Sequence, residues 1–154
     1  MEWHDGEGNK VTEEKLFEEI NKHTAANGKV FIGTDSQLKV TTCTFASAIC
    51  LHGALGQRGG RYFFSKKKSD KKSLHVLRWR IMKEVENSIK IGLKVLEKNP
   101  DVDIEIHLDI GTTHRSKTRK FVEVMKGWTS SMGFKCKVKP HAWASASVAD
   151  KHTK

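Results

Sequence analysis

The chain has 154 residues, 37% of them hydrophobic and 30% charged, a composition typical of a soluble globular protein, and we expect a single domain over residues 1–154. The sequence contains no apolar run long enough to cross a bilayer, and the polar segment 1–10 is no signal peptide, so we expect a cytoplasmic protein with no membrane partner. The formal net charge of +10 predicts a polyanionic partner, of which nucleic acid is the commonest.

The first predicted helix leads into the stretch around which the chain is organised. Thr12 is a candidate N-cap, acids fill the first turn, and the Asn-Gly pair at 27–28 supplies a stop, so we expect a packing helix between them. The sequence VFIGTDSQ at 30–37 then changes from apolar to polar, which is typical of a buried strand leaving a sheet. Asp35 stands at the predicted end of that strand, where it either caps a turn or contributes to a site.

Two more strands are predicted next. Residues 39–51 are rich in Thr, Val, Ile and Phe and should pair antiparallel with the first strand. After a glycine-rich turn, residues 61–65 should complete an antiparallel meander. Residues 66–72 carry five lysines, which indicates a solvated loop or a segment that grips a phosphate backbone. The cysteines, Cys43, Cys50 and Cys136, form no CxxC pair, so we predict core residues and no zinc site.

The longest helical pattern covers residues 73–98, with an apolar stripe at helical spacing and an Asn-Pro stop at 99–100. Glu84 and Glu86 border opposite edges of that stripe. Acids at such borders are most often solvated flank residues.

Segment 102–111 is the counterpart of the first predicted strand. Its Ile and Leu residues alternate with polar ones, the period of a strand, and Asp109 falls at its end before a glycine. Because a long helix precedes it, this strand can return parallel to the first strand by a crossover. Asp35 and Asp109 should then lie side by side at one edge of the sheet.

The last third of the chain is basic and carries one more acid of interest. Residues 112–121 are rich in cationic and hydroxyl groups and lead into a helix, so they form either a capped, solvated helix start or a phosphate site. The candidate phosphate ligands there are Arg115, Lys117 and Arg119. A final strand is expected over 134–139, and the tail, 141–154, contains Asp150.

The order of predicted elements, with acids on the first strand, the long helix, the fourth strand and the tail, resembles the ribonuclease H-like fold. More narrowly, FIGTDSQ at 31–37, HLDIG at 107–111, KTR at 117–119 and the segment 145–154 are similar to the YkuK-type family of predicted ribonuclease H-like proteins. This resemblance implies an α/β fold with a central mixed five-stranded sheet, an antiparallel meander plus parallel strands, flanked by helices.

The resemblance also implies a catalytic metal site. Its ligands would be Asp35 as the bridging carboxylate, Glu84 or Glu86 from the helix, Asp109 and Asp150. Four such acids packed together without a metal would raise one another's pKa, whereas two Mg²⁺ or Mn²⁺ ions prefer oxygen ligands and stabilise both the attacking and the leaving oxygen of a phosphodiester. Ser36 and Gln37 would orient a phosphate or a water, or are simply turn residues.

Three classes of function follow from these residues. The first is a metal-dependent nuclease acting on RNA, DNA or a hybrid by a two-metal mechanism. The second is a non-catalytic nucleic-acid-binding module on the same fold, and the third a structural protein whose acids are solvated. Trp143 is a candidate for stacking on a base. The histidines near the predicted sheet edge, His114, His141 and His152, are more often bystanders.

Overall fold

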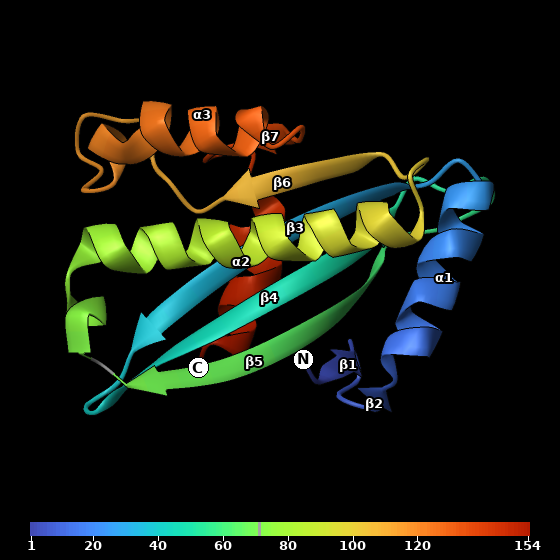
Figure 1. The fold of residues 1–154 in the computed structure, drawn as a ribbon, viewed down its shortest axis with the longest axis horizontal. Helices are drawn as coiled ribbons and strands as arrows, with labels where there is room; N and C mark the ends of the chain where they lie inside the picture. The colour runs from blue at the N-terminus through green and yellow to red at the C-terminus, as the bar shows by residue number, and fades with distance from the viewer. Residues whose placement is uncertain (71) are drawn as a thin grey trace.

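The computed structural model describes residues 1–70 and 72–154, and across them runs one seven-stranded mixed sheet (Figure 1). The strands are β1 (Trp3–Asp5), β2 (Lys10–Val11), β3 (Lys29–Leu38), β4 (Thr42–His52), β5 (Arg61–Asp70), β6 (Ile104–Leu108) and β7 (Lys135–Lys137). Their spatial order is β2-β1-β5-β4-β3-β6-β7. The predicted α/β class and mixed sheet are confirmed, but the described part of the chain has seven strands and not five. The two extra strands are too short and polar to show a period, and only their pairing beside β5 makes them strands.

The centre of the sheet is the predicted antiparallel meander with parallel strands added on one side. β3 pairs antiparallel with β4, and β4 with β5. β6 returns parallel to β3, and β7 is parallel to β6. The predicted crossover is therefore confirmed, and it brings the carboxyl ends of β3 and β6 to the same edge.

The lysine-rich segment 66–72 is a correction to the sequence analysis. β5 continues through Lys66, Lys67 and Lys68 as far as Asp70, because these residues pair with Thr42–Ala46 of β4. Long-range pairing thus overrides the low strand propensity of lysine. Lys71 lies outside the described residues.

Three helices in the described part of the chain cover one face of the sheet. They are α1 (Glu13–Ala25), α2 (Leu77–Lys98) and α3 (Val122–Ser131), accompanied by short helical turns η1 (Lys72–His75), η2 (Arg119–Phe121), η3 (Ala144–Ala149) and η4 (Asp150–His152). The Thr12 hydroxyl accepts a hydrogen bond from Lys15 N at 3.1 Å, so this predicted N-cap is confirmed. Asn27, at φ 62°, takes the left-handed conformation that ends the helix.

The core has two parts, one on each face. Helix residues such as Ile20, Ile81 and Met125 pack on Ile32 and Ile106, which point from β3 and β6 toward the helices. The opposite face is covered by the C-terminal segment η3–η4, drawn in red behind the strands in Figure 1. There Ala144 and Ala149 pack on the small residues Ala48 and Cys50 of β4.

Within residues 1–70 and 72–154, no helix combines the length and the apolar character that crossing a bilayer requires.

Candidate active site

Asp35 and Asp109 are placed by the parallel pair of strands. The register of β3 and β6 ends at Thr34 opposite Leu108, so Asp35 is the next residue of β3 and Asp109 is the residue that directly follows β6. Asp35 does not end its strand, as the sequence suggested, because β3 continues beside β4 to Leu38. It is instead the first residue of β3 beyond the pairing with β6, and its side chain is buried, only 6% exposed.

Glu84 reaches the same place from α2. It is buried rather than solvated, and the Ser36 hydroxyl donates a hydrogen bond to its Oε1 at 2.8 Å. Glu86, the alternative helix ligand, lies on a different side of α2, where it pairs with Lys90 at 2.7 Å and Lys83 at 3.6 Å. A helical residue two positions further on is rotated by about 200°, which explains why only one of the two glutamates faces the aspartates.

Asp150 is brought to the site by the packing of the C-terminal segment onto β3. Gly33 makes this approach possible, because a Cβ there would lie 2.4 Å from the backbone N of Ser145. The neighbouring backbone N–H of Ala144 donates to Nδ1 of His107, a buried side chain on β6, at 3.0 Å. The glycine of the GTDSQ motif and the histidine of the HLDIG motif therefore dock the segment that carries the fourth acid.

The pKa of Asp35 reflects the other acids that lie beside it. Burial, and then the charge of Glu84 and contacts with Asp150 and Asp109, raise the pKa of Asp35 to about 9. Burial also raises the pKa of Glu84 to about 8, although the Ser36 hydroxyl and Arg80 favour its charged form. In the metal-free protein, burial therefore favours the protonated form of both side chains.

Two lysines neutralise the other two acids. Lys139 Nζ lies 2.9 Å from Oδ1 of Asp109, and Lys154 Nζ lies 3.6 Å from Oδ2 of Asp150. Asp109, together with Asp35 and Glu84, raises the pKa of Lys139. The Lys139 backbone N–H donates to Ile110 O at 3.0 Å, which fixes the ammonium group beside the end of β6. No local sequence pattern indicates Lys139, because its position depends on the turn that follows β7.

The residues fit a divalent metal site in their chemistry, while the described part of the chain shows no group of three His, Cys, Asp or Glu side chains already gathered as ligands. All four candidate ligands are carboxylates, which supply the hard oxygen atoms that Mg²⁺ and Mn²⁺ prefer. Asp109 Oδ1 is also buried and, apart from the ion pair with Lys139, accepts no hydrogen bond from the described residues. A metal ion would therefore have to replace the Lys139 ammonium group at this oxygen.

The candidate substrate-binding residues are more widely spread over the structure than the four acids. Ser36 uses its hydroxyl on Glu84, while Gln37 is exposed and accepts a hydrogen bond from Lys39 at 3.2 Å. The three cationic candidates, Arg115, Lys117 and Arg119, are exposed and follow β6 along the chain, in and just after the loop at 112–118. That loop is held to the end of β6, because the Gly111 N–H donates to the Thr118 hydroxyl at 2.8 Å.

Most of the other residues considered in the sequence analysis either pack against neighbouring side chains or are exposed. His152 stacks on Phe64 with ring centroids 3.7 Å apart. Trp143 packs against Phe31 at 4.8 Å and remains 37% exposed, so part of its ring is available for stacking. His114 and His141 are exposed. Cys43 and Cys50 are buried and Cys136 is partly buried, and all three are free thiols, which confirms the predicted packing role.

Comparison with known proteins decides the family. The family model described as "Ribonuclease H-like" matches residues 11–154. The chain belongs to the ribonuclease H-like family. It is also 28% identical to "Uncharacterized protein YkuK" of Bacillus subtilis (strain 168) over 156 residues, which cover 92% of this chain and 88% of that relative. The predicted YkuK-type, ribonuclease H-like resemblance is thereby confirmed. No solved structure matches the chain.

Proposed function

We propose that this protein is a nuclease that hydrolyses phosphodiester bonds of RNA, DNA or a hybrid with two divalent ions held by Asp35, Glu84, Asp109 and Asp150. The observation that carries the proposal is that Glu84, Asp109 and Asp150, from a helix, the end of a strand and the tail, each lie close enough to the buried Asp35 to raise its pKa. Burying carboxylates beside one another disfavours their charged form, which costs free energy and is seen in the raised pKa values of Asp35 and Glu84. Acids that are kept together at such a cost are typical of a functional site, and a bound cation would stabilise their charged forms.

Bound Mg²⁺ or Mn²⁺ would supply the positive charge needed at the attacking and leaving oxygens of the phosphodiester. The side chains of this protein would provide the rest. Ser36 holds the Glu84 carboxylate in one orientation through its 2.8 Å hydrogen bond. Lys139 neutralises Asp109 while no metal is present, and its ammonium group then lies beside the site, where it can contact a substrate phosphate.

The substrate class is supported by the charge of the chain and by the surface next to the acids. The net charge of +10 favours a polyanion and raises its rate of encounter. Arg115, Lys117 and Arg119 are exposed after the strand that carries Asp109, so they are placed to contact backbone phosphates. These contacts would be independent of base sequence.

The proposal is tested by incubating single- and double-stranded RNA and DNA and an RNA/DNA hybrid with the protein and Mg²⁺ or Mn²⁺. We expect hydrolysis of at least one substrate, its loss in EDTA, and a fall of about a hundredfold or more in kcat for Asp35→Asn. Asp103→Asn is the matched control, because Asp103 is partly exposed just before β6 and pairs with Lys135 at 3.1 Å. Equal activity of Asp35→Asn and the parent would refute the assignment.

A second candidate function is non-catalytic nucleic-acid binding. It is favoured by the two lysines, Lys139 and Lys154, which already neutralise Asp109 and Asp150 without any metal. Binding that is unchanged by EDTA, with no cleavage of any of the five substrates, would support this function over the nuclease. Salt dependence does not separate the two functions, because both rely on phosphate contacts.

A further inference from the structure

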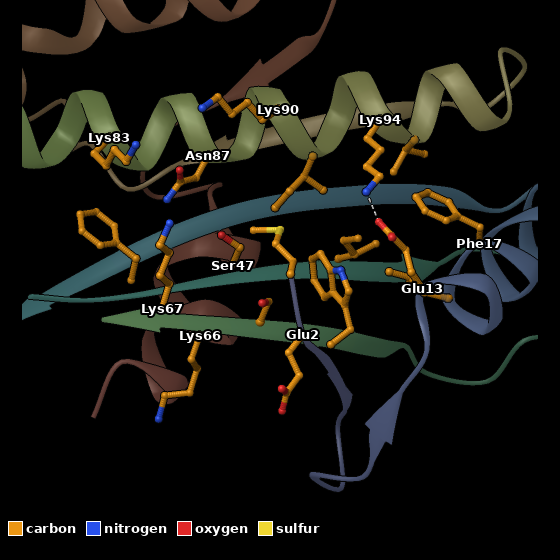
Figure 2. Close-up of a pocket in the computed structure, with 18 residues that line it drawn as sticks. Glu2, Glu13, Phe17, Ser47, Lys66, Lys67, Lys83, Asn87, Lys90 and Lys94 are labelled. Carbon is orange, nitrogen blue, oxygen red and sulfur yellow. Dashed lines mark ion pairs between the residues drawn. The ribbon is translucent and has the colours of Figure 1, made fainter. Parts of the chain in front are cut away.

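The molecule has a second candidate site in a cavity of about 470 Å³ between α2 and the helix-covered face of β4 and β5 (Figure 2). Such a volume is within the range of small-molecule pockets. None of the four acids of the candidate active site lines it. The cavity follows α2 from Lys83 to Lys94, about 17 Å of helix.

The end of the cavity nearest α1 is apolar. This part is lined by core side chains, including Leu16, Phe17, Val95 and Trp3 of β1. Of the two acids that line the cavity, Glu13 forms an ion pair with Lys94, drawn as the dashed line in Figure 2, and Glu2 pairs with Lys10 at 3.7 Å. This end therefore carries little uncompensated charge and favours an apolar ligand group.

The other end of the cavity is cationic. Figure 2 shows Lys67 of β5 extending across the cavity toward Asn87 of α2, with Lys83 beside it. Lys83 shares Glu86 with Lys90, and the described residues place no acid within ion-pair distance of Lys67. Lys67 and Lys83 thus place two ammonium groups at this end of the cavity, and the carboxylate that pairs with Lys83 is shared with Lys90, which leaves net positive charge where a small anion would fit.

The neighbour of Lys67 shows that this orientation is specific. Lys66 is the next residue on β5, and in Figure 2 its ammonium group points away from the cavity, on the other side of the sheet. The alternation follows from the strand, in which successive side chains point to opposite faces. The pairing of Lys67 with Phe45, and of Lys66 with Ala46, keeps each lysine on its face.

We propose that the cavity binds a small amphiphilic anion, an alkyl phosphate, with its head at Lys67 and Lys83 and its alkyl body along α2 toward Val95. Charge complementarity favours the phosphate group at the lysines, and the apolar side chains favour the alkyl chain at the other end. A nucleotide fits less well, because the polar edges of its base would lose water against apolar side chains. This site is separate from the proposed nuclease centre and does not depend on it.

The proposal is tested with n-octyl phosphate, titrated into the full chain in EDTA and followed by calorimetry and by methyl shifts of Ile91 and Val95. EDTA prevents recruitment of the phosphate by a metal at the acidic centre. We expect octyl phosphate to bind at least about tenfold more tightly than inorganic phosphate, octanol or adenosine monophosphate, since each lacks one of the two matching parts. Equal or tighter binding of any of the three would overturn the proposal.

Matched variants locate the head group. Lys67→Gln should weaken octyl phosphate binding about tenfold, as expected for loss of a charged phosphate contact, and Lys66→Gln less than about twofold. Asn87→Trp should abolish binding by filling the cationic end, with an unchanged circular dichroism spectrum. A loss in Lys66→Gln equal to that in Lys67→Gln, or undiminished binding in Asn87→Trp, would show that the ligand lies elsewhere.

Discussion

Replacing Glu84 by Gln should stabilise the metal-free protein, although it removes a proposed catalytic group. The folded-state pKa of Glu84 is about 8, against 4.5 for the ordinary side chain. Because the folded pKa is the higher one, the folded protein binds a proton that the unfolded chain releases. The contribution of Glu84 to the free energy of unfolding is therefore most favourable below about pH 4 and becomes less favourable as the pH rises toward 8.

The size of the effect follows from the same two values. Near pH 7, folding must protonate a carboxyl whose unfolded pKa is 4.5, which costs about 3 kcal/mol. Gln is neutral in both states, and its Oε1 still accepts the hydrogen bond from Ser36. We therefore expect Glu84→Gln to raise the free energy of unfolding by up to about 3 kcal/mol near pH 7 and by almost nothing near pH 4.

The assay is urea unfolding in EDTA, followed by tryptophan fluorescence between about pH 4 and pH 8. Glu86→Gln is the control two residues away on α2. Glu86 is partly exposed and pairs only with lysines, so this variant should lose about 0.5 kcal/mol or less. Adding Mn²⁺ should stabilise the parent more than Glu84→Gln, because a ligand of the ion is missing in the variant. A variant less stable than the parent in EDTA near pH 7, or a difference that does not change with pH, would refute this reasoning.

Further predictions concern the docking of the tail and the lysine at the site. Gly33→Ala should lower the free energy of unfolding by about 2–3 kcal/mol, because its Cβ would collide with the Ser145 backbone, whereas Gly127→Ala, with no atom within 4 Å, should raise it by about 1 kcal/mol. Equal effects of the two in thermal unfolding would contradict the close packing. Lys139→Met should lower the Mn²⁺ concentration at half-maximal thermal stabilisation severalfold, because the lysine competes with the ion for Asp109. An unchanged midpoint would mean that this ion pair does not oppose metal binding.

Local sequence patterns were enough to predict the main helices and strands. They also predicted that Asp35 and Asp109, two of the four acids, lie beside each other. The alternation of 102–111 and the apolar run before Asp35 indicate strands, because side chains must alternate between faces or be buried on both. A long helix between those strands permits a parallel return by a crossover, and that return places Asp35 and Asp109 side by side. The sequence motifs and the order of predicted elements also predicted membership of the ribonuclease H-like family.

Tertiary structure decided what depends on contacts between distant segments. Strand pairing turned the lysine run at 66–68 into part of β5, and the rotation of α2 chose Glu84 over Glu86 for the buried position. The closeness of Asp150 and Lys139 to the site came from packing of the tail and the turn after β7, which no local pattern encodes. The physical reason is that propensity and period act over a few residues, while burial and the resulting pKa shifts depend on every segment that excludes water from the same place.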